Sequence, residues 1–424
     1  MLRHLQSLLA FLARAVLARY APRIVAVAGS VGKTSTTRAI AATLARSVST
    51  RGSVKNHNNE IGVPLTILGE EKSGGRSPFA WAAILWRGFR LAFGPVRDYP
   101  KVLVLEMATD HPGDLARLAH LAPPDVAVLT AISEEHTEYL GDLDGVAKEE
   151  GTIVRALRPG GVAVLNADDP RVAMLKSAAP MALLFGFDVS ADLRAERVEP
   201  ELALGTVFTR FDLVIDHQRH AVNLPGALGD GNVYAALAAA AVALSFHVDP
   251  AVIPYGLAEY EPPAGRLRVL PGIKGTTLID DTYNSSPRAA ELALHTFQRV
   301  PCPTGGRRIA AMGDMLELGA LTEDAHHRIG ALAARSGVEL LIGVGPASVF
   351  LCQAAKESGM PEERVFHFAK AEEAGHFLQE RLHPGDLLLV KGSQGVRMEK
   401  IVKEVMAEPE RAAELLVRQS QEWL

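Results

Sequence analysis

Residues 23–40 read RIVAVAGSVGKTSTTRAI, and this stretch predicts both a fold class and a binding turn. Its first part, IVAVAG at 24–29, is a short run of apolar and β-branched residues, which is typical of a buried strand. Residues 33–46 follow with the composition of a helix. A strand, a glycine turn and a helix are the context that a phosphate-binding loop requires.

The turn is tighter than the regular pattern G-x-x-x-x-G-K-[ST], which would place a glycine at Val27. Glycine lets backbone N–H groups approach phosphates, and the following helix adds its positive N-terminal dipole. Lys33 can neutralise phosphate oxygens and Thr34 can ligate Mg²⁺, whereas a plain turn needs neither. The predicted nucleotide-binding residues are Gly29, Ser30, Val31, Gly32, Lys33, Thr34 and Ser35.

Strand-like runs recur downstream, at 102–106, 126–130 and 162–166, with helical stretches between them. This alternation predicts a parallel sheet with helices on both faces. Residues 205–224 alternate apolar and polar side chains, which indicates an antiparallel insert, and 232–246 is an Ala-rich helix.

A Pro/Gly-rich stretch at 261–272 is the best linker candidate. The β/α rhythm then restarts at 276–280, 307–314, 340–345 and 386–392. We therefore predict an α/β protein, in which a central P-loop ATPase-like domain with a parallel sheet and an antiparallel insert precedes a Rossmann-like C-terminal domain. The predicted parts are an N-terminal amphipathic helix at 1–21, a central ATP-binding domain at 22–264 and a C-terminal domain at 265–424.

Composition narrows the class of protein. Of the 424 residues 48% are hydrophobic and 22% charged, as in a globular protein, and the formal net charge of −5 disfavours a nucleic-acid binder. The two cysteines, Cys302 and Cys352, exclude a disulfide framework and a Cys-rich zinc site. This cysteine usage predicts a cytoplasmic protein.

Two apolar segments stand apart. Residues 1–20 form an amphipathic helix on a helical wheel, but Arg14 and Arg19 interrupt the run that a membrane span needs. Residues 77–93 are apolar nearly all round, with Arg87 and Arg90 as the only charges. Packing of both helices on the protein itself is the favoured interpretation. The alternative is peripheral membrane contact.

Glu106 and His136 follow two of the predicted strands. Because ligands gather outside the carboxyl ends of parallel strands, both side chains are expected near the phosphate loop. A carboxylate and an imidazole there would suit a divalent cation.

Ten motifs occur in order along the chain. They are GSVGKTS (29–35), NNEIGVP (58–64), LEMATDHPGDL (105–115), EEH (134–136), GVAKEEG (145–151), VLNADDP (164–170), GRL (265–267), DDTYNSSP (280–287), GDMLELG (313–319) and VKGSQG (390–395). The set resembles the Mur ligase family of ATP-dependent amide-forming enzymes. NNEIGVP and GDMLELG resemble the branch that adds D-alanyl-D-alanine to UDP-N-acetylmuramoyl-tripeptide.

The resemblance implies that a substrate carboxylate attacks ATP to give an acyl phosphate, which an amine converts to an amide. ATP and Mg²⁺ are the implied cofactors, and cell-wall peptides or amino acids are the implied substrates. The implied residues are Lys33, Glu106, His136 and Glu150 for catalysis; Thr34, Glu106, His136 and Glu150 for the metal; Asn232, Arg266 and Asp281 for ATP; and Asn58, Asn59, Tyr283, Asn284, His326 and Lys391 for the substrate.

The sequence departs from the family pattern at three points. Glu150 stands where the family carries a carbamylated lysine, and we expect its carboxylate to serve directly, since Lys148 lies on another helix face. About twenty residues precede the loop, so the branch's UDP-binding domain is expected to be absent, and a UDP-sugar substrate is not assumed. Ser286 replaces an asparagine in the family's Y-N-x-N-P.

Three alternatives stay open: a ligase acting on a non-UDP or lipid-linked carboxylate, a non-catalytic ATP-binding partner subunit, and a plain NTPase. The plain NTPase leaves NNEIGVP and GDMLELG unexplained. The sequence predicts no oligomeric state.

Overall fold

The structure is a computed structural model that describes residues 2–54, 57–96, 98–109, 111–133, 137–140, 142–203, 206–420 and 423. The chain divides into two compact units. The first comprises Met1–Val198, Phe211–Asn223 and Asp230–Glu261, and the second comprises Glu199–Arg210, Leu224–Gly229 and Pro262–Leu424.

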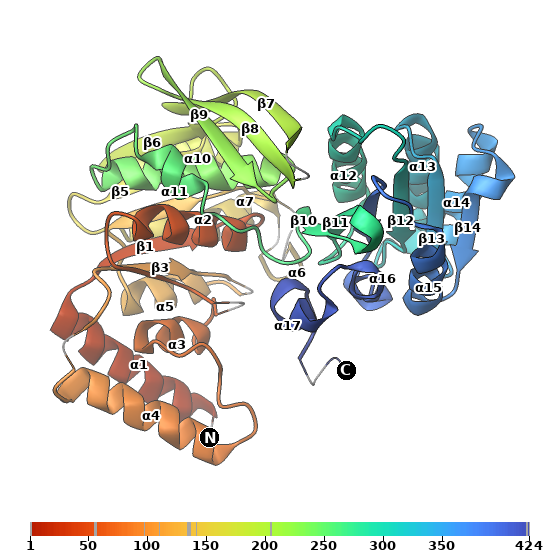
Figure 1. The fold of residues 1–424 in the computed structure, drawn as a ribbon. Helices are drawn as coiled ribbons and strands as arrows, with labels where there is room; N and C mark the ends of the chain where they lie inside the picture. The colour runs from red at the N-terminus through yellow and green to blue at the C-terminus, as the bar shows by residue number, and fades with distance from the viewer. Residues whose placement is uncertain are drawn as a thin grey trace. The chain divides into compact units, whose positions relative to one another are not determined.

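A nine-stranded sheet, in the order β2-β3-β1-β4-β5-β6-β7-β8-β9, starts in the first unit (Figure 1). Its strands are β1 (Arg23–Ala28), β2 (Thr50–Gly52), β3 (Val102–Glu106), β4 (Val126–Leu129), β5 (Val162–Asn166), β6 (Met181–Gly186), β7 (Leu193–Ala203), β8 (Thr206–Ile215) and β9 (Gln218–Pro225). All neighbouring strands from β2 through to β7 pair in parallel, which confirms the predicted parallel sheet.

The predicted antiparallel insert is the β8–β9 hairpin. Only Asp216 and His217 separate the two strands, and their φ angles are 47° and 65°. Two successive left-handed residues are the signature of a tight hairpin turn, so neighbouring β8 and β9 run antiparallel.

Helices cover both faces of the first sheet. In this unit they are α1 (Leu2–Tyr20), α2 (Lys33–Ala45), α3 (Gly62–Leu68), α4 (Pro78–Phe93), α5 (Asp114–Leu121), α6 (Thr137–Leu140), α7 (Leu143–Glu150), α8 (Thr152–Arg155), α9 (Pro170–Ala173), 3₁₀ helix η1 (Met174–Ala178), α10 (Asp230–Ser245) and α11 (Ile253–Leu257). Figure 1 shows α2 and α10 on one face of the strands and α1, α3 and α5 on the other. The α1 helix packs on the sheet side through Leu9, Leu12 and Val16, which are buried, as the favoured interpretation predicts.

The second unit holds a six-stranded sheet in the order β10-β11-β15-β12-β13-β14. Its strands are β10 (Arg268–Pro271), β11 (Thr277–Asp281), β12 (Arg308–Gly313), β13 (Leu340–Val344), β14 (Val365–Phe368) and β15 (Leu387–Lys391). Its helices are α12 (Pro287–Arg299), α13 (Thr322–Arg335), α14 (Ser348–Glu357), α15 (Ala371–Arg381), α16 (Glu399–Val405), α17 (Ala412–Leu415), and the 3₁₀ helices η2 (Ile273–Gly275), η3 (Gly319–Leu321), η4 (Glu362–Arg364), η5 (Gln394–Val396) and η6 (Pro409–Arg411).

Two apolar clusters, one on each face, enclose this second sheet. All its pairings are parallel except that between β10 and β11. The linker predicted at 261–272 is therefore wrong in part, because Arg268–Pro271 pairs antiparallel with β11. Mixed α/β architecture with a second sheet agrees with the predicted fold class.

Candidate active site

The phosphate-loop candidate connects the end of β1 to the start of α2. Gly29 has φ +120° and Gly32 has φ +89°, conformations that side chains disfavour. A Cβ on Gly29 would lie 2.3 Å from Thr130 Oγ1, so only glycine fits there. The missing glycine at Val27 is not a defect, since Val27 is a buried residue of β1.

The residues after β4 hold the loop in shape. Thr130 Oγ1 donates a hydrogen bond to the Val31 carbonyl at 2.6 Å, and Ser30 N–H donates to the Ala131 carbonyl at 2.8 Å. Ser133 N–H donates to Ser30 Oγ at 2.9 Å. Sequence reasoning missed Thr130 and Ser133, although polar residues directly after a strand next to β1 were a usable signal.

The Lys33 ammonium contacts the loop itself. It donates to the Gly29 carbonyl at 2.6 Å and to the Ser30 carbonyl at 2.9 Å. Thr34, the next residue, lies in the first turn of α2, whose leading N–H groups have no partner within the helix. The turn thus combines backbone donors, a helix N-terminus and one cation, an arrangement that suits a phosphate group.

Glu106 lies beside the loop, as its place at a strand end predicts. It pairs in register with Val27 in the parallel β1–β3 ladder. Its carboxylate is 2% exposed, and Oε1 accepts a hydrogen bond from Asn58 Nδ2 at 3.0 Å. Oε2 is buried and has no hydrogen-bond partner among the described residues. A buried carboxylate oxygen without a partner is costly, so a cation such as Mg²⁺ fits this position.

Asn58 and Asn59 behave differently from each other. Asn58 donates to Glu106, whereas Asn59 Oδ1 accepts from the N–H groups of Ile61 and Gly62 and so caps the start of α3. Substrate binding by either residue stays a prediction.

Glu150, the last residue of α7, is 3% exposed and reaches the phosphate loop. Its Oε2 accepts the Gly29 N–H at 2.8 Å. Lys148 is exposed, in agreement with its predicted place on another helix face. Glu149 accepts hydrogen bonds from the N–H groups of Gly113 and Leu115 at the start of α5.

His136 lies outside the described residues. Across the part of the chain that is described, His, Cys, Asp and Glu side chains form no group of three or more that could hold a metal ion. That Thr34, Glu106, His136 and Glu150 bind a metal ion therefore stays a prediction.

Two residues of the VLNADDP motif (164–170) hydrogen-bond to the backbone of the segment after β4, which holds the phosphate-loop candidate. Asn166 Nδ2 donates to the Thr130 carbonyl at 2.9 Å, and Asp169 Oδ2 accepts the Ile132 N–H at 2.7 Å. Asn232, expected to bind ATP, is buried in α10 and accepts the Tyr260 hydroxyl at 2.6 Å.

In the second unit, predicted residues from separate segments converge. Lys391 is 2% exposed, and its Nζ lies 2.7 Å from Asp281 Oδ2 and donates to the Asn284 carbonyl at 2.9 Å. The Arg266 guanidinium lies over the Tyr283 ring, 4.2 Å from its centroid. Next to Asp281, burial raises the pKa of Asp280 to about 6, while hydrogen bonds from Thr282 and Gly265 oppose that rise.

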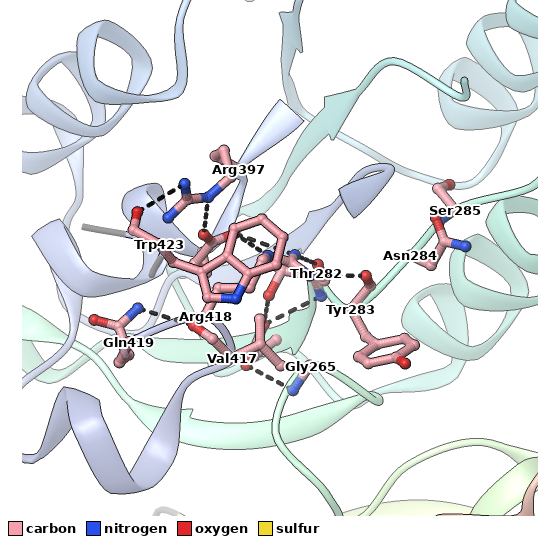
Figure 2. A network of polar contacts seen from close by, with 12 residues as sticks. Gly265, Thr282, Tyr283, Asn284, Ser285, Arg397, Val417, Arg418, Gln419 and Trp423 are labelled. Carbon is pink, nitrogen blue, oxygen red and sulfur yellow. Dashed lines mark hydrogen bonds and ion pairs between the residues drawn. The ribbon is translucent and has the colours of Figure 1, made fainter. Parts of the chain in front are cut away.

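The C-terminal segment ties down the same loop, as Figure 2 shows. Arg418 donates to the carbonyl of Thr282 and, at 3.1 Å, to that of Tyr283. Its guanidinium also pairs with the fully buried Glu399 at 3.2 Å. Arg397 pairs with Glu399 at 2.6 Å and donates to the Trp423 carbonyl at 3.0 Å. Sequence reasoning missed this network, which no motif marks.

His326 is fully buried, and both ring nitrogens are occupied. Nδ1 donates to the Thr322 carbonyl at 2.7 Å, and Nε2 accepts the Met315 N–H at 3.0 Å. The ring thus joins the GDMLELG turn (313–319) to α13. Direct substrate contact would require one of these bonds to break.

The fold and the loop together define a class of protein, the ATP-dependent Mur ligases. Residues 27–77 and 88–243 match the Mur ligase middle domain, and residues 265–394 match the Mur ligase glutamate ligase domain. The chain belongs to the Mur ligase family.

Its relatives narrow the class. The UDP-N-acetylmuramoyl-tripeptide–D-alanyl-D-alanine ligase of Escherichia coli (strain K12) is 31% identical over 383 residues, which cover 90% of this chain and 76% of the relative. The enzyme of the same name from Bacillus subtilis (strain 168) is 29% identical over 398 residues, covering 94% and 79%. The structure of MurF ligase from Thermotoga maritima in complex with ADP superposes with a TM-score of 0.73 at 26% identity, covering 96% of this chain and 84% of that one.

Proposed function

We propose that this ATP-dependent ligase adds D-alanyl-D-alanine, or an amino acid, to the carboxylate of a cell-wall peptide precursor. The names of the relatives support this substrate class. The single observation that carries the chemistry is the buried Oε2 of Glu106 beside the glycine loop, which has no hydrogen-bond partner in the part of the chain that the structure describes.

The proposed reaction has two steps. A carboxylate oxygen of the peptide attacks the γ-phosphorus of ATP, and ADP leaves. The amine nitrogen then attacks the acyl carbon, loses a proton, and phosphate leaves with the oxygen that came from the peptide. The ATP phosphates bind at the 29–35 loop through the N–H groups that follow Ser30, and Lys33 offsets their charge. Asn232, Arg266 and Asp281 are proposed to contact the rest of ATP.

Mg²⁺ is part of the proposal. Thr34, Glu106, His136 and Glu150 would hold it, and the bound ion would screen the phosphate charge that repels an attacking carboxylate. Asn58, Asn59, Tyr283, Asn284, His326 and Lys391 stay proposed substrate-side residues. For Lys391 and His326 the observed bonds support an indirect role, in which they position the 281–284 loop and the 313–319 turn.

The test is a ligation assay with UDP-N-acetylmuramoyl-tripeptide, D-alanyl-D-alanine, ATP and Mg²⁺, in which mass spectrometry follows product and ADP together. We expect equal amounts of both. Lys33→Ala should lower the rate by about 100-fold or more, because a cation aimed at the phosphates is lost. The exposed Lys148→Ala is the matched control and should behave as the wild type. ADP release that needs no peptide would contradict the proposal and indicate a plain NTPase.

A second candidate substrate is a lipid-linked carboxylate, favoured by the exposed aromatic surface of α1 and α4. Product from a lipid-linked precursor, with none from the UDP-tripeptide, would select it. No nucleotide turnover with either precursor would favour a non-catalytic partner subunit. Membrane contact through residues 1–20 and 77–93 is likewise a proposal.

A further inference from the structure

The α4 helix presents apolar side chains to solvent instead of polar ones. Its exposed positions follow helical spacing and lie on the side away from buried Ile84, Gly88 and Ala92. The exposed residues are Pro78, Phe79, Ala82, Ala83, Trp86, Arg87, Phe89, Arg90 and Phe93. Phe79 is 87% exposed and Trp86 is 62% exposed. A helix on the surface of a water-soluble domain normally places its charged residues there.

Aromatic rings link this face to α1, which packs beside α4 (Figure 1). Trp86 and Phe89 have ring centroids 6.0 Å apart, and Phe89 and Phe93 are 5.1 Å apart. Phe93 then lies 6.4 Å from Phe11 of α1, which is 56% exposed. We call Phe11, Phe79, Trp86, Phe89 and Phe93 the aromatic face. Ring contacts join Phe11, Phe93, Phe89 and Trp86, and Phe79 lies two helical turns before Trp86 on the same side of α4.

Charge on the two helices is of one sign. Neither α1 nor α4 contains an aspartate or a glutamate. Arg14 and Arg90 are exposed, and among the described residues no carboxylate pairs with either. Arg90 lies one turn from both Trp86 and Phe93, so a cation is set within the aromatic face. This local positive charge contrasts with the net charge of −5 of the whole chain.

We propose that the aromatic face and its arginines dock the protein on an anionic lipid bilayer, with α4 lying in the plane of the surface. Phe and Trp side chains on one side of a helix, flanked by arginine, are the pattern of interfacial helices, and the rings would enter the headgroup boundary. The described helices include none that is long and apolar enough to cross a bilayer, so attachment is to the surface. A second copy of the chain fits less well, because a symmetric contact would bring together two copies of a surface on which arginine is the only charged residue type.

Vesicle flotation tests this surface without any ligase readout, so its outcome is independent of the proposed reaction. The full chain is mixed with phosphatidylcholine vesicles, with and without phosphatidylglycerol. We expect flotation with the anionic vesicles, and weaker flotation with phosphatidylcholine alone or at high salt. For the triple variant Trp86→Ser/Phe89→Ser/Phe93→Ser, the affinity for anionic vesicles should fall by about tenfold or more. Arg14→Glu/Arg90→Glu should abolish the preference for anionic lipid.

The matched control is Met174→Ser/Met181→Ser/Val189→Ser, which removes three other exposed apolar residues of the same unit and should float as the wild type does. Unchanged thermal melting would show that the variants fold. As a second measurement, tryptophan emission should shift to the blue on adding anionic vesicles, and Trp86→Phe should remove that shift. Wild-type protein that stays unbound, equal flotation with both vesicles, or a dimer that the aromatic triple variant dissociates would each overturn the proposal.

Discussion

Glu150 is the residue at which this chain departs most clearly from the pattern of its family. Where the family carries a lysine, Glu150 brings a carboxylate to the backbone of the phosphate loop, 2.8 Å from Gly29 N. The carboxylate of the neighbouring Glu149 instead accepts a hydrogen bond from Gly113 at the start of α5, so the two carboxylates bind different segments. The geometry supports the proposal that Glu150 acts without carbamylation.

Glu150→Gln isolates the charge of this side chain. The glutamine oxygen can still accept the Gly29 N–H, so the loop should keep its shape and melting should change little. Loss of a carboxylate near the proposed metal should lower the ligation rate by about 10- to 100-fold. Parallel assays with and without bicarbonate should give equal wild-type rates. Full activity in Glu150→Gln, or a carbamyl group on Lys148 in intact-protein mass spectrometry, would exclude this role.

At the level of single residues, the sequence predicts position better than contact. Glu106 was expected near the loop because it ends a strand, and the β1–β3 register confirms that position. Its open Oε2 was not predictable, because it depends on where Asn58 packs. The bonds of His326 and Lys391 depend in the same way on residues distant in sequence, Met315 and Asn284.

At the scale of elements, the segment after α17 acts as a clasp on the loop between β11 and α12. Arg418 reaches two backbone carbonyls of that loop, next to Asp281, and its side chain is only 5% exposed. Because the carbonyls belong to Thr282 and Tyr283, the clasp sets the backbone that presents Asp281 and Asn284. We infer that Arg418 positions residues proposed to bind ATP and substrate.

Arg418→Ala should lower the melting temperature, because it leaves Glu399 buried with one arginine partner fewer and removes two hydrogen bonds from the guanidinium to the Thr282 and Tyr283 carbonyls. Breaking a buried pair in this way costs about 3 kcal/mol or more. In addition, the KM for ATP should rise more than kcat falls, which a purely global loss of stability would not produce. Arg411→Ala is the control, since its pairs with Glu408 and Glu414 lie at the surface and contribute little. If Arg418→Ala melts at the same temperature as the wild type, Arg418 does not stabilise the loop between β11 and α12 and this role is wrong.

The elements themselves were predictable where one physical signal dominates. The central strands are continuous apolar runs because both of their faces are buried. Strand β7 was missed because LRAERVEPELA has no such run, and β10 was taken for a linker because proline and glycine flank it. Strand β7 lies between β6 and β8 but is only partly buried, and β10 is a short edge strand, so neither carries the continuous apolar run that marks the central strands.

At the scale of the whole molecule, the α/β class followed from the repeated strand–helix rhythm, which recurs in both of the chain's sheets. The likeness to solved Mur ligases over nearly the whole chain agrees with that prediction. What the rhythm did not predict is the aromatic face, since the same apolar residues at 77–93 would also suit a buried helix. Only the packing of α4 shows which of its sides is covered.

The proposed chemistry is tested most directly by following one oxygen atom. The peptide precursor is prepared with ¹⁸O in its reacting carboxylate, and the phosphate released during ligation is analysed by mass spectrometry. If the carboxylate attacks ATP and forms an acyl phosphate, each phosphate released with product carries one ¹⁸O atom from the peptide. Product that accumulates together with unlabelled phosphate would contradict an acyl phosphate.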